Sequence, residues 1–235
     1  SRFVVVNRQV LWRSPILLTP YRSDYTIDAD ELKEFFGNAY KNAKLTPEDI
    51  DTGAVILTGE ALKRNNARAI ADLFAEESGK FVCASAGHNL EALMAANGSG
   101  AVGLSRKDHQ TILNIDVGGG TVKLGLCHNG KLLATSAFAV GGRLIAFDDD
   151  GKMVRIEGPA EQVAEDVGVK LTLGEVLSKE DRKKIVSRMV DVIVSYATRD
   201  PNDDLCKALL LTESLPQTPE INGITFSGGV SEYIY

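Results

Sequence analysis

Apolar residues recur with two different periods along the chain. In the first hundred residues, four short apolar runs rich in β-branched side chains predict strands; they are FVVV (3–6), QVLWRSPILLT (9–19), GAVILTG (53–59) and KFVCA (80–84). Between them, apolar positions three or four residues apart predict amphipathic helices, at 28–40, 60–77 and 89–98, with a short helix at TPED (46–49). Strands that alternate with helices predict an α/β fold.

The second half of the chain repeats this order. Strands are predicted at 111–119, 121–127, 132–140 and 223–229, and helices near Ala160–Val167 and at Lys179–Arg199. Ser178 and Asp181 are capping residues for the longer helix, whereas KALLLTE (207–213) is ambiguous between helix and strand. We therefore expect two related α/β lobes, at 1–104 and 105–235.

The most informative motif is NIDVGGGTVKLGL (114–126), in which three glycines separate two alternating apolar runs. Because apolar residues alternate on both sides and Asn129-Gly130 then supplies a tight turn, the glycines are predicted to lie between strands. A dinucleotide fingerprint needs glycines that open a helix, and a Walker loop needs G-x-x-x-x-G-K-[ST]. Neither pattern fits.

A glycine hairpin can still bind phosphate through its backbone, because the chain without β-carbons aims successive N–H groups at anionic oxygens. Asp116 repels phosphate, so its natural role is to hold Mg²⁺ through water or to orient an attacking water. The alternative is a bulged hairpin with a solvated aspartate. Two further glycine pairs, in AVGGRLI (139–145) and TFSGGVS (225–231), also follow apolar strands and favour a nucleotide stretched along a cleft.

Composition narrows the classes of partner. Hydrophobic residues make up 44% and charged residues 25%, and the net charge is −6. This balance, without a cluster of basic and aromatic residues, argues against a nucleic-acid partner. No apolar run reaches the length of a membrane span. Cys83, Cys127 and Cys206 lack the spacing of a zinc site and fit a reducing cytoplasm.

Two motifs resemble the actin, Hsp70 and sugar-kinase superfamily. IDVGGGTVKLGL (115–126) is similar to its second phosphate loop and ITFSGGVSEYIY (224–235) to its adenosine motif, while 55–101 has the element order of its first lobe. More closely, the chain as a whole resembles the large reactivating factors of ethanolamine ammonia-lyase, the EutA type.

The resemblance implies an actin-like ATPase fold, with two ribonuclease-H-like lobes that bind Mg-ATP between them. Asp116 would position the water shell of the metal and the attacking water. The other implied contacts are glycine-rich: Gly118, Gly119, Gly120 and Thr121 to the β- and γ-phosphates, Gly228 and Gly229 to the adenosine, and Gly141 and Gly142 near the ribose or phosphates.

The implied activity is ATP hydrolysis coupled to lobe movement. This movement would release damaged cobalamin from the partner, ethanolamine ammonia-lyase, in the cytoplasm, and cobalamin itself would be bound only by the partner. Two alternatives stay open at this point: a kinase of a sugar or small acid, and a nucleotide-switched interaction protein such as a filament subunit.

The chain departs from the superfamily pattern in three places. The first phosphate loop would precede Ser1, and a segment would follow the adenosine motif, so we expect both ends to be truncated. Glu91 is only a loose counterpart of the Glu-Pro found in the connecting helix of the family. With one of two phosphate loops, this chain is expected to bind ATP weakly.

Overall fold

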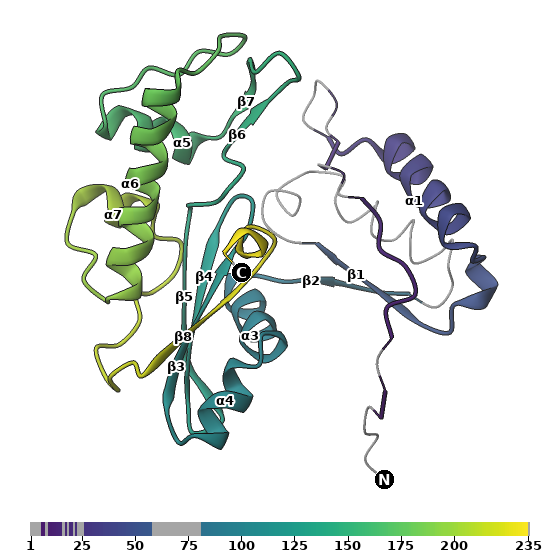
Figure 1. The fold of residues 1–235 in the computed structure, drawn as a ribbon, viewed down its shortest axis with the longest axis horizontal. Coiled ribbons are helices and arrows are strands. Elements are labelled where there is room, and N and C mark those ends of the chain that lie inside the picture. The colour runs from purple at the N-terminus through teal and green to yellow at the C-terminus, as the bar shows by residue number, and fades with distance from the viewer. Residues whose placement is uncertain are drawn as a thin grey trace. The chain divides into compact units, whose positions relative to one another are not determined.

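The computed structural model describes residues 6–7, 9–15, 17, 19–20, 22, 26–57 and 81–234, and it forms two compact units, Ser1–Ser85 and Ala86–Tyr235. The first unit contains α1 (Ala29–Ala43), the 3₁₀ turn η1 (Pro47–Asp49), β1 (Gly53–Leu57) and β2 (Phe81–Ser85) (Figure 1). The two strands are parallel, with Gly53 opposite Phe81.

The first unit confirms most of the predicted elements that it describes. Asp28 begins α1 by accepting hydrogen bonds from the amides of Asp30 and Glu31, at 3.0 and 3.2 Å, as expected of an N-cap. The strand predicted at 9–19 is wrong, because its described residues form no strand. Pro15 interrupts this run and lacks the N–H that a strand ladder needs. The strand predicted at 3–6, apart from Val6, and the helix predicted at 60–77 lie outside the described residues.

The second unit is built on a four-stranded sheet in the order β5-β4-β3-β8, next to a small antiparallel pair, β6 and β7. Its elements are α3 (His88–Gly98), α4 (Ala101–Lys107), β3 (Thr111–Val117), β4 (Val122–His128), β5 (Lys131–Phe138), β6 (Ile145–Phe147), β7 (Met153–Ile156), α5 (Gly158–Asp166), α6 (Lys179–Ala197), α7 (Asp204–Leu209), β8 (Gly223–Ser227) and η3 (Ser231–Tyr233). The predicted α/β class is confirmed.

Successive side chains of β3 point to opposite faces of the sheet, and both faces are buried. Leu113, Ile115 and Val117 pack in the larger core with residues of α6 such as Val192, whereas Ile112 packs in a smaller cluster with residues of α3 and α4. The sheet therefore lies between α3 and α4 on one face and α6 on the other (Figure 1). None of the helices within the described ranges is long and apolar enough to cross a bilayer.

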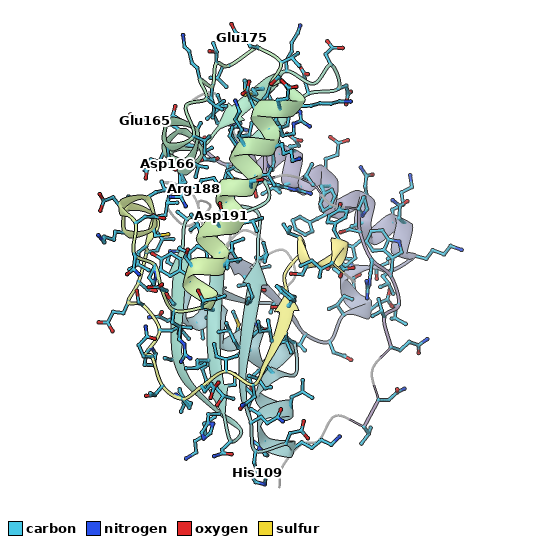
Figure 2. All side chains as sticks on the ribbon, turned by 60° about the vertical axis from the view of Figure 1, so that its left-hand side comes forward. His109, Glu165, Asp166, Glu175, Arg188 and Asp191 are labelled. Carbon is cyan, nitrogen blue, oxygen red and sulfur yellow. The ribbon has the colours of Figure 1, made fainter. Side chains whose placement is uncertain are left out.

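Helices α5, α6 and α7 are joined by Arg188. Its guanidinium donates to Asp166 at 2.7 Å, both labelled in Figure 2, and to Asp203 at 2.9 Å. Elsewhere on α6, the ring of Tyr196 stacks on Phe138 with a centroid separation of 4.4 Å. The predicted cap of α6 is confirmed, since Ser178 accepts the amide of Asp181 at 3.0 Å. Of the ambiguous segment at 207–213, residues 207–209 form the end of α7, and Leu210 forms an isolated β-bridge with Phe138.

The hairpin between β4 and β5 turns at Asn129-Gly130, where both residues have positive φ, 47° and 78°. This conformation is the one that Asn-Gly favours in a two-residue turn, as the sequence predicted. Helices α3 and α4 belong with the second compact unit because they pack on its sheet. The predicted lobes, 1–104 and 105–235, instead place α3 with the first lobe and divide α4 between the two, and the limits of the lobes stay a prediction.

Candidate functional site

Three glycine segments meet at one edge of the second unit's sheet. β3 is parallel to β8 and antiparallel to β4, and β4 is antiparallel to β5. Strands β3, β5 and β8 therefore all run in the same direction. Their carboxyl ends lead into Gly118–Thr121, Gly141–Gly142 and Gly228–Gly229. The direction of the strands alone brings these segments to a common edge.

Backbone hydrogen bonds join the three segments. The amide of Gly142 donates to the carbonyl of Gly118 at 3.0 Å, and the amide of Arg143 donates to the carbonyl of Gly119 at 2.7 Å. On the other side, the amide of Val230 donates to the carbonyl of Val117 at 3.2 Å. The hairpin loop is thus held between the two glycine pairs.

Three of these glycines are required by contacts within the protein. A Cβ on Gly141 would lie 2.3 Å from the carbonyl oxygen of Gly119, and a Cβ on Gly228 would lie 2.4 Å from that of Val117. A Cβ on Gly142 would lie 2.5 Å from a methyl group of Val230. Contacts with backbone at these distances exclude a side chain at Gly141 and Gly228, whereas at Gly142 the Val230 side chain would have to move. The close approach of the three segments therefore depends on glycine.

The surface formed by these segments is mostly exposed backbone. Gly119, Gly120 and the pair Gly228–Gly229 are exposed, and Gly118 and Thr121 are half-buried. Among the described residues, no atom lies within 4 Å of a Cβ built on Gly120 or Gly229. Packing in this unit therefore gives no reason for glycine at these two positions. A ligand that approaches the backbone closely would give one.

Asp116 is oriented by a chain of polar side chains from β3 and β8. The hydroxyl of Ser227 donates to the Asp116 carboxylate at 2.8 Å and accepts from the Asn114 amide at 3.0 Å. The side-chain Oδ1 of Asn114 accepts from the hydroxyl of Thr225 at 2.9 Å. Asn114 is almost completely buried. Every member of this network has a partner, so the network fixes where the carboxylate points.

Sequence reasoning missed Lys123, a charged neighbour of Asp116, and noted Glu91 only as a loose counterpart of a family motif. Lys123 in β4 is the direct cross-strand neighbour of Asp116, and the ammonium of Lys123 forms an ion pair with Glu91 of α3. Both side chains are 8% exposed. A lysine within an otherwise apolar strand was the available signal. Its partner could not be inferred, because the docking of α3 on the sheet decides it.

An apolar cavity of about 280 Å³ adjoins the glycine segments. Gly141, Gly142 and Val230 form one wall, and Val186 and Val190 of α6 belong to another. The guanidinium of Arg182 lies 4.4 Å above the ring of Phe147, and both residues line the cavity. An apolar pocket with few polar groups, next to exposed backbone amides, has the character of a small-molecule site.

The chain belongs to a known family. The sequence model described as "Ethanolamine utilisation protein EutA" matches residues 1–235, and the chain is therefore a member of the EutA family. Two curated relatives carry the name ethanolamine ammonia-lyase reactivase EutA. The protein of Salmonella typhimurium strain LT2 is 36% identical over 233 residues, and that of Escherichia coli strain K12 is 37% identical over 235 residues.

Each of these matches covers 98% of this chain and 49% of the relative, so the chain spans about half the length of the curated relatives. The resemblance to the EutA type is confirmed. The roles assigned to Asp116 and to the glycines stay predictions, because the family match assigns no role to any residue.

Solved structures give weaker likenesses. MreB5 of Spiroplasma citri bound to AMPPNP overlaps with a TM-score of 0.44 at 18% identity, over 88% of this chain and 66% of that one. Ethanolamine utilization protein EutJ from Carboxydothermus hydrogenoformans overlaps with a TM-score of 0.40 at 14% identity, over 86% and 60%. Overlaps at this level assign no role to any residue of this chain. Membership of the family depends on the sequence match.

Proposed function

We propose that the protein is an ATP-dependent reactivating factor for ethanolamine ammonia-lyase, with an actin-like arrangement and a nucleotide site on the second unit. The observation that carries the proposal is the meeting of three glycine segments beside Asp116 at one edge of the sheet. The family match supports the partner, because its relatives are named reactivases of this lyase. We place the activity in the cytoplasm.

The residues present fit a nucleotide in three respects. The glycine segments offer exposed backbone that a polyphosphate can approach closely. The adjoining cavity offers apolar walls for a base. The Lys123 ammonium lies beneath the loop, 3.8 Å from the position of a Cβ on Gly118. Gly118–Thr121 would bind the β- and γ-phosphates, Gly228–Gly229 would back the adenosine, and Gly141–Gly142 would lie near the ribose or phosphates.

Asp116 would hold Mg²⁺ mainly through water, since the described residues include no group of three or more His, Cys, Asp or Glu side chains that could hold a metal. When bound, Mg²⁺ would neutralise charge on the phosphate oxygens. Ser227 keeps the Asp116 carboxylate in one orientation by donating to it. From this position Asp116 can accept a proton from an attacking water. Hydrolysis would then change the contacts of the loop and drive movement of the lobes.

The proposed work of this cycle is release of damaged cobalamin from the lyase. Cobalamin stays on the partner enzyme, and this protein supplies only the nucleotide-driven movement. The test mixes the complete protein, lyase inactivated during turnover, intact adenosylcobalamin and Mg-ATP. Lyase activity should return with the unaltered protein and with Asp150→Ala, which removes an exposed carboxylate outside the site.

Asp116→Ala should abolish the recovery. Equal recovery with Asp116→Ala would refute the role of this residue. If the unaltered protein restores no lyase activity but a sugar or small acid stimulates its ADP formation, the kinase alternative replaces the reactivase.

A further inference from the structure

A buried ion pair lies beneath the hairpin loop. Lys123 in β4 and Glu91 in α3 are in contact, and each side chain is 8% exposed. Removing two charges from water costs free energy that their mutual attraction often fails to repay. A buried pair is therefore weak evidence for stability, and its position beside a candidate ligand site favours a role in that site.

The ammonium of Lys123 lies close to the loop on the face of the sheet that carries Asp116. Lys123 and Asp116 are opposite each other in the ladder between β3 and β4, and opposed side chains lie on the same face. The Nζ atom is 3.8 Å from the position that a Cβ on Gly118 would take. An anion bound by the loop would therefore meet the field of this ammonium at short range.

The ion pair has unused capacity for hydrogen bonding. The second carboxylate oxygen of Glu91 is buried and has no partner among the described residues. An ammonium carries three N–H donors, and its contact with one oxygen of Glu91 uses one of them. Lys123 can therefore keep Glu91 and hold an anionic oxygen as well.

Glu91 is held in place by the close packing of α3 on the sheet. A Cβ on Gly125 of β4 would lie 3.1 Å from the Cβ of Ala96 and 3.5 Å from the carbonyl oxygen of Ala92, both in α3. The helix can approach this closely because Gly125 has no side chain. Figure 1 shows α3 against the sheet. The contact between Lys123 and Glu91 therefore connects the loop to α3.

We propose that Lys123 senses the terminal phosphate and so distinguishes a nucleoside triphosphate from a diphosphate, while Glu91 positions its ammonium. The inference rests on the proposed nucleotide site and names the residue that distinguishes which nucleotide is bound there. Asp116, assigned to the metal and the attacking water, acts at the terminal phosphate, and Lys123 is its cross-strand neighbour. A triphosphate brings to this point the charge of the γ-phosphate, which a diphosphate lacks.

The test measures Kd for Mg-ATP and for Mg-ADP by calorimetry on the complete protein. Lys123→Met should weaken Mg-ATP by about tenfold or more, the factor expected for loss of one charge-assisted hydrogen bond, and change Mg-ADP by less than about twofold. Lys131→Met removes an exposed lysine at the start of β5, beyond the far end of β4, and should change neither affinity. Glu91→Gln keeps an oxygen that can accept from the ammonium and so position it, but removes the competing negative charge, and should increase the preference for ATP.

Each outcome has one meaning. If the unaltered protein binds neither nucleotide, the proposed function fails. If it prefers ATP and Lys123→Met keeps that preference, or weakens both nucleotides equally, this inference alone is overturned. If Lys123→Met does not fold, as judged by circular dichroism, Glu91→Gln and Lys123→Arg decide: a raised preference in the first and a retained one in the second support the inference, and any other result overturns it.

Discussion

The amide of Gly142 donates a hydrogen bond of 3.0 Å to the carbonyl of Gly118. Two glycine segments that are far apart in the sequence are thereby fixed against each other, and the second supports the loop formed by the first. Val230, next to the third segment, lies so close to Gly142 that a side chain there would force Val230 to move. The three segments therefore support one another, and we expect a substitution that disrupts one of them to displace the others.

Gly141→Ala should destabilise the second unit. The new Cβ would lie 2.3 Å from the carbonyl oxygen of Gly119 and 2.6 Å from the nitrogen of Gly120, so two backbone segments must move apart. We expect a loss of about 1–3 kcal/mol in the free energy of unfolding, the usual cost of overpacking. Urea unfolding measures it.

The matched control is Gly158→Ala at the start of α5. No atom among the described residues lies within 4 Å of a Cβ at this position, and alanine favours a helix more than glycine does. Its stability should stay the same or rise by up to about 1 kcal/mol. Equal stability of the two variants would show that Gly141 does not pack against the loop as described.

Gly120→Ala should separate stability from ligand binding. The described structure leaves open space around a Cβ on Gly120, so the free energy of unfolding should change by no more than about 1 kcal/mol, the usual effect of Gly→Ala at a position whose backbone alanine can adopt. A phosphate held by the loop backbone would be obstructed, and Mg-ATP should bind at least about tenfold more weakly, a loss of about 1.4 kcal/mol. Calorimetry measures Kd for Mg-ATP in the variant and in the unaltered protein. Unchanged affinity would mean that the ligand does not approach this glycine.

Ser227→Ala should impair Asp116 without removing it. The carboxylate would lose its only donor in the network described, and Asn114 would lose its acceptor. We expect a lower kcat for ATP hydrolysis, with a smaller effect on KM, because orientation of the carboxylate matters most during the reaction. Ser227→Thr keeps the hydroxyl and should recover much of kcat. Equal kcat in the alanine and threonine variants would contradict this role.

Stability should fall in alkaline solution because of two buried thiols. Burial raises the pKa of Cys127 and of Cys206 from an ordinary 9.0 to about 11. Since the folded-state pKa is raised, the stabilising effect is complete below pH 9 and is lost as the pH rises toward 11. The midpoint of urea unfolding should decrease across this window. Cys127→Ala should make the decrease less steep; an unchanged slope would show that this thiol does not contribute.

Local features of the fold could be predicted from the sequence because short-range physics determines them. The cap at Asp28, the cap at Ser178 and the Asn129-Gly130 turn each depend on a few neighbouring residues. The strand predicted at 9–19 was wrong because Pro15 lies within the run and cannot donate to a strand ladder. The pair β6 and β7 was missed, since three or four residues carry too little pattern.

Part of the candidate site could also be read from the sequence. Glycine after each of three strands indicated a backbone surface, and the parallel direction of those strands explains why the segments meet. The partners of Asp116 could not be predicted, because Ser227 lies 111 residues away and reaches it only through the pairing of β3 with β8. The contact between Glu91 and Lys123 depends in the same way on the packing of a helix.

The most direct test of the central claim is amide hydrogen exchange of the complete protein with and without Mg-ATP. If the three glycine segments bind one polyphosphate, exchange should slow together at Gly118–Thr121, Gly141–Gly142 and Gly228–Gly229. The turn at Asn129-Gly130, at the far end of β4, is the internal control and should not change. Slowing in one segment alone, or equal slowing in the control turn, would contradict the account.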